Sequence, residues 1–404
     1  MLNIKIYDWI WIFPFCIMYI LSYVFVPLMY GSILDARPFE YNFFYPIALL
    51  ACSVSIYSIL KNKILNLNLF SINQRGAYAM SRLIGSSFSL TLAFLITIFG
   101  VVVILSINNY SPWDYLSSLE YIRITLFYKY KFIKLLPFLF LLICLARIPL
   151  DALSPKYCLR TLLMITLVVV LYYYRQLLGV YIVALSVYTA IFLPKKRYLI
   201  FIYLFFGLSF FIVWNFYRGS NQGAGFGNVL IDIIFTYGDN AKNISIYTDN
   251  CYQRFSFFPG EAILANIYTT LNFFGLPAIA TSQVEFNACI RGVTASSVIN
   301  QDVSGGVTYG IIPELHSMFG SDLFLGPVIG ITASLLIFTY VGRLFLRSKF
   351  FSSYALFVVF LSFTLPFDFS NSLARLIILM LFGIFSSWSV NSIVSRASHF
   401  DIAK

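Results

Sequence analysis

Two residues able to take up a proton, Glu314 and His316, stand in the segment Pro313-Glu314-Leu315-His316-Ser317-Met318-Phe319-Gly320, just before an apolar run. Either side chain can act as a general base toward a hydroxyl group that lies within hydrogen-bond reach. An α-helix would place them about 200° apart, so they share a face only if the segment is extended. The alternative is a structural role, a polar helix entry in which Glu314 interacts with the N-terminal end of the helix dipole.

Four arginines form the second candidate group. Arg175 separates two short apolar runs, Arg218 ends a run, Arg291 precedes a glycine, and Arg375 lies inside the last run. A guanidinium stays charged and presents a planar fork to paired oxygens, so several arginines at one membrane face predict a diphosphate cradle. In the alternative, each arginine snorkels and anchors a helix end among lipid phosphates. The position of Arg375 within a run favours the functional role.

The sequence lacks the patterns of nucleotide- and metal-dependent chemistry. No Gly-rich loop ends in Gly-Lys-Ser or Gly-Lys-Thr, and no Asp-x-Asp or Glu-x-Asp pair occurs. The two histidines, His316 and His399, belong to no Cys/His cluster of the kind that holds zinc. We therefore expect chemistry without a metal or other cofactor.

Composition indicates the setting in which these residues work. Of the 404 residues, 60% are hydrophobic and 11% are charged, which predicts an all-α integral membrane protein. Ten apolar runs approach the length needed to cross about 30 Å of hydrocarbon. They are Trp9–Tyr30, Phe44–Leu60, Leu83–Ile107, Leu135–Leu150, Thr161–Tyr174, Leu177–Leu193, Tyr198–Tyr217, Leu323–Gly342, Phe350–Pro366 and Leu373–Val394.

The fifth and sixth runs are short and are separated only by Arg175 and Gln176. They form either a tight hairpin at one membrane face or one long tilted helix. The expected fold therefore has about ten transmembrane helices, within a range of ten to twelve.

The distribution of basic residues predicts the orientation, because loops rich in Lys and Arg tend to stay in the cytoplasm. With both termini inside, the inner segments hold most of the basic residues and few of the acidic ones. The net charge of +11 thus reflects topology, and no soluble basic domain is present to bind nucleic acid. The inner basic residues are Lys5, Lys61, Lys63, Arg75, Arg82, Arg147, Lys156, Arg160, Lys195, Lys196, Arg197, Arg343, Arg347, Lys349, Arg396 and Lys404.

A long segment, 218–322, divides the chain into an N-terminal membrane region of about seven helices, 1–217, and a C-terminal one of about three, 323–404. This segment is predicted to lie outside the membrane on its outer face. Within it, Glu261–Ala280 is expected to form an interfacial or re-entrant helix broken by Pro277, because one extra crossing would reverse the charge pattern. Cys251 and Cys289 either form a disulfide in an oxidising compartment or remain independent thiols.

Several of these features together resemble a known family. They are the hairpin Tyr174-Arg175-Gln176-Leu177-Leu178, the exit Phe216-Tyr217-Arg218-Gly219 into the long outer segment, and the entry Glu314-Leu315-His316-Ser317-Met318-Phe319-Gly320 with Gly326 beyond it. Their order over residues 172–330 resembles the oligosaccharide repeat-unit polymerases, the Wzy-type O-antigen polymerases. Some members carry Arg, ten intervening residues and Gly in each of two outer loops. Here Arg218 and Arg291 lie in one loop with different spacings, so the match of Arg291 departs from that pattern.

The resemblance implies a glycosyltransferase of the bacterial inner membrane that acts on undecaprenyl-diphosphate-linked oligosaccharides at its periplasmic face. Glu314 would be the base for the acceptor hydroxyl, with His316 as the alternative. Arg175, Arg218, Arg291 and Arg375 would bind the diphosphate. Implied partners are the lipid-linked substrate, membrane lipids and a chain-length-regulator protein, and neither a nucleic acid nor a cofactor is required.

Three alternatives remain open. An O-antigen ligase shares the general plan and would differ in its acceptor. A transporter or flippase for lipid-linked sugars would also need arginines facing a cavity, but such proteins usually contain internal repeats and polar residues in mid-helix, and this sequence shows no repeat and few mid-span charges. A membrane scaffold without activity is the third possibility.

Overall fold

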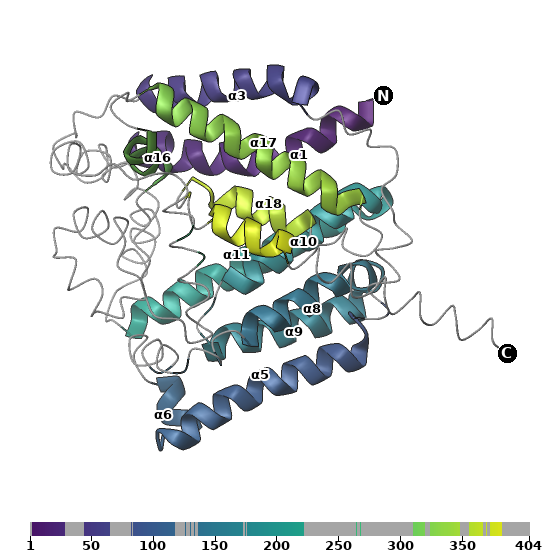
Figure 1. The fold of residues 1–404 in the computed structure, drawn as a ribbon. Coiled ribbons are helices and arrows are strands. Elements are labelled where there is room, and N and C mark those ends of the chain that lie inside the picture. The colour runs from purple at the N-terminus through teal and green to yellow at the C-terminus, as the bar shows by residue number, and fades with distance from the viewer. Residues whose placement is uncertain are drawn as a thin grey trace, which may run out of the picture.

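The computed structural model describes residues 2–28, 44–64, 82, 84–117, 126, 130, 133, 136–172, 174, 176–221, 264, 267, 310–319, 324–347, 355–366, 369 and 372–381. Every regular element in these residues is a helix (Figure 1). This confirms the all-α fold class. Most of the segment 218–322, including Cys251, Cys289 and nearly all of the expected helix Glu261–Ala280, lies outside the described residues.

The helices follow the predicted apolar runs closely. The first half contains α1 (Leu2–Ile20) with its π-helical continuation η1 (Leu21–Phe25), α3 (Phe44–Ile64), α5 (Ser87–Ile107), α6 (Pro112–Ser117), α8 (Leu136–Asp151), α9 (Pro155–Tyr172), α10 (Gln176–Phe192), η3 (Pro194–Lys196) and α11 (Tyr198–Asn221). The second half contains α16 (Ile311–Phe319), α17 (Leu325–Arg347), α18 (Ala355–Thr364) and a last apolar helix, Ser372–Leu381.

Local sequence explains several helix starts. The Ser86 hydroxyl accepts the Ser89 backbone N–H at 3.1 Å at the start of α5, and Ser111 accepts the Asp114 N–H at 3.1 Å at the start of α6. Both are side-chain N-caps, which satisfy N–H groups that have no partner within the helix. Pro155 opens α9, where a missing N–H has no cost.

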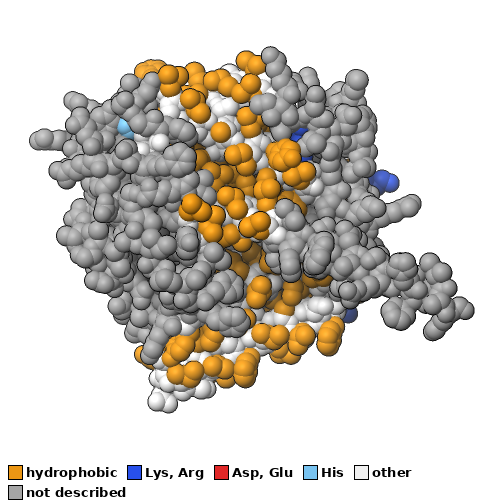
Figure 2. Space-filling model, in the orientation of Figure 1, with side chains coloured by type: hydrophobic (Ala, Val, Ile, Leu, Met, Phe, Trp, Pro, Cys, Tyr) orange, Lys and Arg blue, Asp and Glu red, His pale blue; other side chains and the backbone are white. Residues whose placement is uncertain are grey.

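In the part of the chain that the structure describes, five helices are long and apolar enough to cross a membrane, in agreement with an all-α membrane protein. They are Trp11–Leu28, Phe44–Lys61, Ser87–Ile107, Pro155–Tyr172 and Leu325–Phe345, and three shorter apolar helices cover Leu177–Ala190, Tyr198–Trp214 and Ser372–Leu381. Figure 2 shows exposed apolar side chains as a band that crosses the molecule at right angles to the long helices. The count of ten spans stays a prediction.

The fifth and sixth apolar runs are two separate helices rather than one. α9 ends at Tyr172 and α10 begins at Gln176. The ammonium group of Lys196, just after α10, donates to the carbonyl of Leu153, just before α9, at 2.9 Å. Because the end of α10 thus returns to the start of α9, the two helices form an antiparallel hairpin.

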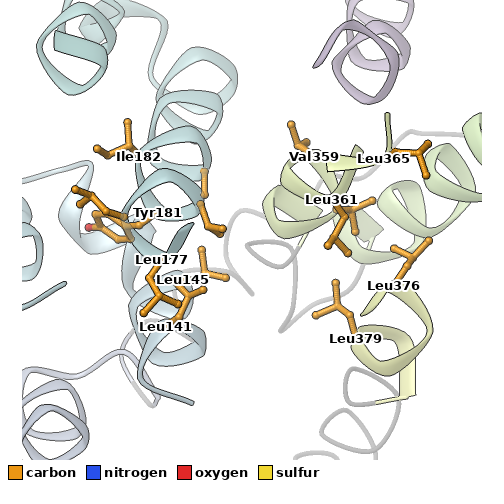
Figure 3. Close-up of a cluster of buried hydrophobic side chains, with 14 of the residues drawn as sticks. Leu141, Leu145, Leu177, Tyr181, Ile182, Val359, Leu361, Leu365, Leu376 and Leu379 are labelled. Atoms are coloured by element: carbon orange, nitrogen blue, oxygen red, sulfur yellow. The ribbon is translucent and has the colours of Figure 1, made fainter. Parts of the chain in front are cut away.

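The helices form two groups. α1, α3, α17 and α18 pack together, so helices from the beginning of the chain share one group with helices that follow the segment 218–322, and α5, α8, α9, α10 and α11 form the other (Figure 1). Hydrogen bonds tie α3 to α17, among them Tyr57 to Thr339 at 2.9 Å. The groups meet where α10 packs against α18. Figure 3 shows the apolar side chains at this junction, with Leu141, Leu145, Leu177, Tyr181 and Ile182 on one side and Val359, Leu361, Leu365, Leu376 and Leu379 on the other.

Gly342 allows α17 to approach α1 closely. A Cβ atom at this position would lie 2.5 Å from the ring of Trp11, which is itself buried. We therefore expect Gly342→Ala to lower the free energy of unfolding by about 1 to 3 kcal/mol, because the crowded ring has to move. Thermal unfolding of the purified protein in detergent measures the effect.

Gly179 in α10 is the matched control, because nothing lies within 4 Å of a Cβ added there. Gly179→Ala should leave stability unchanged or raise it by up to about 1 kcal/mol through helix propensity. Equal melting temperatures for the two variants would show that the contact between Gly342 and Trp11 does not limit packing.

Candidate functional site

The helix that carries Glu314 and His316 is short and buried. All residues from Ile311 to Met318 are buried, and α16 packs against α17. Pro313 is tolerated because it lies in the first turn, where backbone N–H groups have no helical partner. Figure 1 shows α16 at the left-hand end of the bundle, the same end as α6.

Three distant parts of the chain meet at α16. The backbone N–H of Ile311 donates to the carbonyl of Pro366 at 2.9 Å, and the Tyr23 hydroxyl donates to the same carbonyl at 3.2 Å. Glu314 accepts the backbone N–H of Phe369 on its Oε2 atom at 2.8 Å. Pro366 lies just after the end of α18, and Phe369 is helical, so α16 and Tyr23 supply partners to backbone groups beyond the C-terminal end of α18.

The structure separates the two acid–base candidates. Residues 311–319 form an α-helix, so Glu314 and His316 do not share a face. Both side chains are buried. The hydrogen bond from the Phe369 backbone N–H fixes one carboxylate oxygen of Glu314. Glu314 also lies in the first turn of α16, the position that its structural alternative requires.

Arg375 follows Phe369 by six residues along the chain. It is half-buried in the apolar helix Ser372–Leu381. A hydrogen bond of 3.1 Å between the Thr364 and Ser372 hydroxyls joins this helix to α18. The structure thus brings the segment that binds Glu314 next to the helix that carries Arg375.

The structure does not describe the side chains of the other three predicted diphosphate ligands. Arg218 lies in the last turn of α11, where only the backbone is described. Arg175 and Arg291 lie outside the described residues. Among the described residues, no group of three or more His, Cys, Asp or Glu side chains is placed to hold a metal ion.

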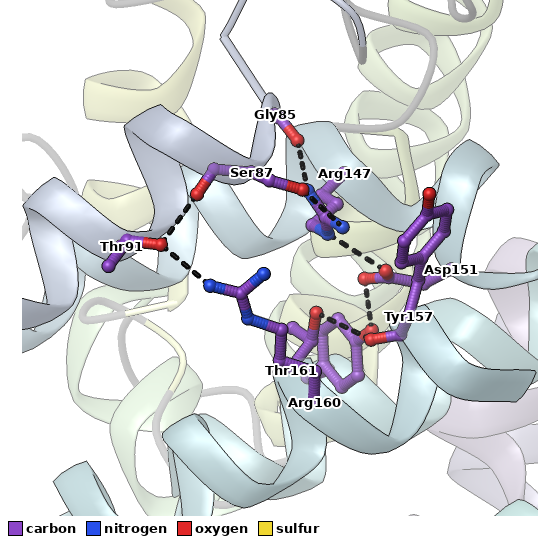
Figure 4. A network of polar contacts seen from close by, with 9 residues as sticks. Gly85, Ser87, Thr91, Arg147, Asp151, Tyr157, Arg160 and Thr161 are labelled. Atoms are coloured by element: carbon purple, nitrogen blue, oxygen red, sulfur yellow. Dashed lines mark hydrogen bonds and ion pairs between the residues drawn. The ribbon is translucent and has the colours of Figure 1, made fainter.

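A second polar cluster, here called the Arg147 cluster, joins Arg147, Asp151, Tyr181 and the Gly85 carbonyl. Figure 4 shows Arg147 between Gly85 and Asp151. Arg147 Nε donates to Asp151 Oδ1 at 2.9 Å, and its Nη1 donates to the Gly85 carbonyl at 2.7 Å. The Tyr181 hydroxyl donates to Asp151 Oδ2 at 2.7 Å. The side chains of the ion pair are 1% and 0% exposed. The guanidinium of Arg147 and both carboxylate oxygens of Asp151 therefore have hydrogen-bond partners within the protein, as buried charges require.

The Arg147 cluster defines the surroundings of two charges. Arg147, listed above among the inner basic residues, belongs to α8 together with Asp151, and both side chains are buried. The sequence does contain a signal for this pair, because opposite charges four residues apart meet on one face of a helix. The Gly85 carbonyl and Tyr181 come from elsewhere in the chain, and no local pattern identifies them as partners.

The Arg147 cluster lies at the end of the bundle opposite to α16. α5 begins near Gly85 and Arg147 and runs to α6, and α6 and α16 are at the same end in Figure 1. The Lys196 bond to Leu153 is also at the Arg147 end. The two candidate regions therefore face opposite sides of the apolar band.

The fold and hydropathy together define an all-α protein with several helices able to span a membrane. Comparison of the chain with models of protein families, with curated proteins and with solved structures finds no match. The function is therefore argued from the site itself.

Proposed function

We propose that this chain is a membrane-embedded glycosyltransferase that polymerises oligosaccharide repeat units carried on undecaprenyl diphosphate. The observation that carries the proposal is the position of Glu314. A carboxylate is buried at one end of the helix bundle and accepts a hydrogen bond from the Phe369 backbone amide, six residues before Arg375 in the chain. A buried carboxylate beside an arginine-bearing helix suits proton transfer coupled to loss of an anionic leaving group.

In the proposed reaction, Glu314 accepts the proton of a hydroxyl group on the acceptor repeat unit. The hydroxyl oxygen bonds to the anomeric carbon of the donor glycan, and the bond from that carbon to the diphosphate oxygen breaks. The electron pair leaves with undecaprenyl diphosphate, whose charge Arg375, Arg218, Arg175 and Arg291 stabilise. His316 is the alternative base. Loss of the diphosphate drives the step, so no nucleotide, metal or other cofactor enters it.

The proposed setting is the bacterial inner membrane, with about ten spans, both termini in the cytoplasm and the segment 218–322 in the periplasm. α16 then lies at the periplasmic end and the Arg147 cluster at the cytoplasmic end. The exposed basic residues Lys156, Arg160, Lys195 and Arg197 agree with this orientation, because they gather at the end of the Arg147 cluster. A chain-length regulator is the proposed protein partner.

Replacement of Arg375 by Lys tests the diphosphate role. Lysine keeps the charge but loses the planar fork, so polymer yield should fall by about ten- to a hundredfold, the loss expected for one charge-assisted hydrogen bond. Glycan ladders from cells that express the variant at the wild-type level measure the yield. A snorkelling arginine would tolerate the change.

Arg197→Lys provides the matched control. Arg197 is exposed at the opposite end of the bundle, and its Nε donates to the Ala190 carbonyl at 3.3 Å. Its replacement should leave the ladder unchanged. A normal ladder from Arg375→Lys would exclude this residue from the diphosphate site. If wild-type protein delivers single repeat units but makes no polymer, a flippase or ligase would be favoured instead.

A further inference from the structure

The exposed face of α9 combines two cations with an apolar stripe. Lys156, Arg160, Leu163 and Leu167 follow a spacing of four, three and four residues, which places them on one face of the helix. All four side chains are exposed. The cations occupy the first two turns of α9, and the leucines extend from them toward the centre of the apolar band.

Arg160 connects this stripe to α5. Its Nη2 donates to the Thr91 hydroxyl at 2.9 Å, and the Thr91 hydroxyl donates to the Ser87 carbonyl at 2.6 Å (Figure 4). α5 carries its own exposed apolar residues within one turn of Thr91, namely Phe88, Leu92 and Leu95. The guanidinium is therefore held at the polar end of a seam between α5 and α9. The two sides of this seam are the exposed apolar residues of α5 just named and Leu163 and Leu167 of α9.

A guanidinium has five N–H donors, and the bond to Thr91 uses one of them. The exposed remainder of the group is available to a ligand outside the protein. Thr91 also fixes the direction of the guanidinium, which lowers the entropy lost when it binds a phosphate.

The charge balance around the seam is positive. In the described stretches 84–107 and 136–221, the one acidic residue is Asp151, which is buried and paired with Arg147. Lys156, Arg160, Lys195 and Arg197 are exposed at the same end. A ligand with a negative head and apolar chains complements both the charge and the exposed leucines.

We propose that the seam between α5 and α9 binds an anionic phospholipid, with its phosphate on Arg160 and Lys156 and an acyl chain along Leu95 and Leu163. This inference does not depend on the proposed glycosyl transfer, because the seam lies at the other end of the bundle. A free phosphate would make the polar contacts alone and would leave the apolar seam unused.

Native mass spectrometry of the detergent-purified full chain, titrated with phosphatidylglycerol and separately with phosphatidylcholine, tests the proposal. Arg160→Gln should weaken phosphatidylglycerol binding by about tenfold, and Lys156→Gln by less, because lysine lacks the fork. Wild-type protein should bind phosphatidylcholine more weakly than phosphatidylglycerol. Leu163→Ala should also reduce phosphatidylglycerol binding, and inorganic phosphate at the lipid's concentration should not displace the lipid.

Lys195→Gln is the control, because it removes one exposed charge from the same end of the bundle away from the seam. Its binding of phosphatidylglycerol should stay within about twofold of wild type. Equal losses from Arg160→Gln and Lys195→Gln would overturn the site in favour of general charge attraction. Equal binding of the two lipids, or displacement by phosphate, would overturn it as well, and equal melting temperatures confirm that the variants are folded.

Discussion

Glu314→Gln is expected to stop glycan growth at a single repeat unit while the protein remains folded and abundant. The substitution keeps the size of the side chain and an oxygen able to accept the Phe369 N–H, so the contact between α16 and Phe369 can persist. It removes the ability to take a proton. Loss of a general base reduces a rate by about 10²- to 10⁴-fold, enough to remove the longer products.

The measurement is the glycan ladder in cells that express each variant at the wild-type level. Ser317→Ala is the matched control, because Ser317 is buried on the same helix and its hydroxyl donates within that helix to the Pro313 carbonyl at 2.6 Å. Its ladder should be normal. A single repeat unit from His316→Gln with a normal ladder from Glu314→Gln would assign the base to His316.

A purely structural role for Glu314 makes a different prediction. The carboxylate would then serve only to satisfy the Phe369 amide, and Glu314→Gln would retain full activity. Normal ladders from Glu314→Gln, His316→Gln and Arg375→Lys together would exclude the proposed mechanism. The flippase, ligase and scaffold interpretations would then come first.

Arg147→Met is expected to be the most destabilising single change at the other end of the bundle, by about 3 to 5 kcal/mol. The reason is that Asp151 would remain buried with the Tyr181 hydrogen bond but without its cation. The Gly85 carbonyl would also lose its partner, and the guanidinium would no longer lie 5.3 Å from the centre of the Tyr157 ring. Denaturant or thermal unfolding of the purified protein measures the loss.

The double variant Arg147→Met with Asp151→Leu tests whether the ion pair itself causes the effect. Replacing both charges with apolar groups removes the buried unpaired charge, so the double variant should be more stable than Arg147→Met alone. Arg160→Gln is the control, because this exposed arginine should change stability by no more than about 0.5 kcal/mol. If Arg147→Met unfolds with the same midpoint as Arg160→Gln, the Arg147 cluster does not stabilise the fold.

The sequence alone determined the fold class and the approximate bounds of the helices. Runs such as Ser87–Ile107 and Leu325–Arg347 are long and apolar, and the preference of such a run for a helix in hydrocarbon depends on its own residues. The i, i+4 spacing of Arg147 and Asp151 is equally local, so this pair was predictable from the sequence. Glu314 and His316 could also be selected from the sequence, because the ability to take up a proton belongs to the residue type.

Only the tertiary structure decided which partners these residues have. Tyr23 reaches Pro366 across 343 positions and Glu314 reaches Phe369 across 55, and hydropathy gives no information about such pairs. It also decided that α1 shares one group with α17 and α18, and that Gly342 lies against Trp11. Local sequence sets the cost of leaving water for each segment, whereas the partner of a buried polar group depends on how separate helices pack.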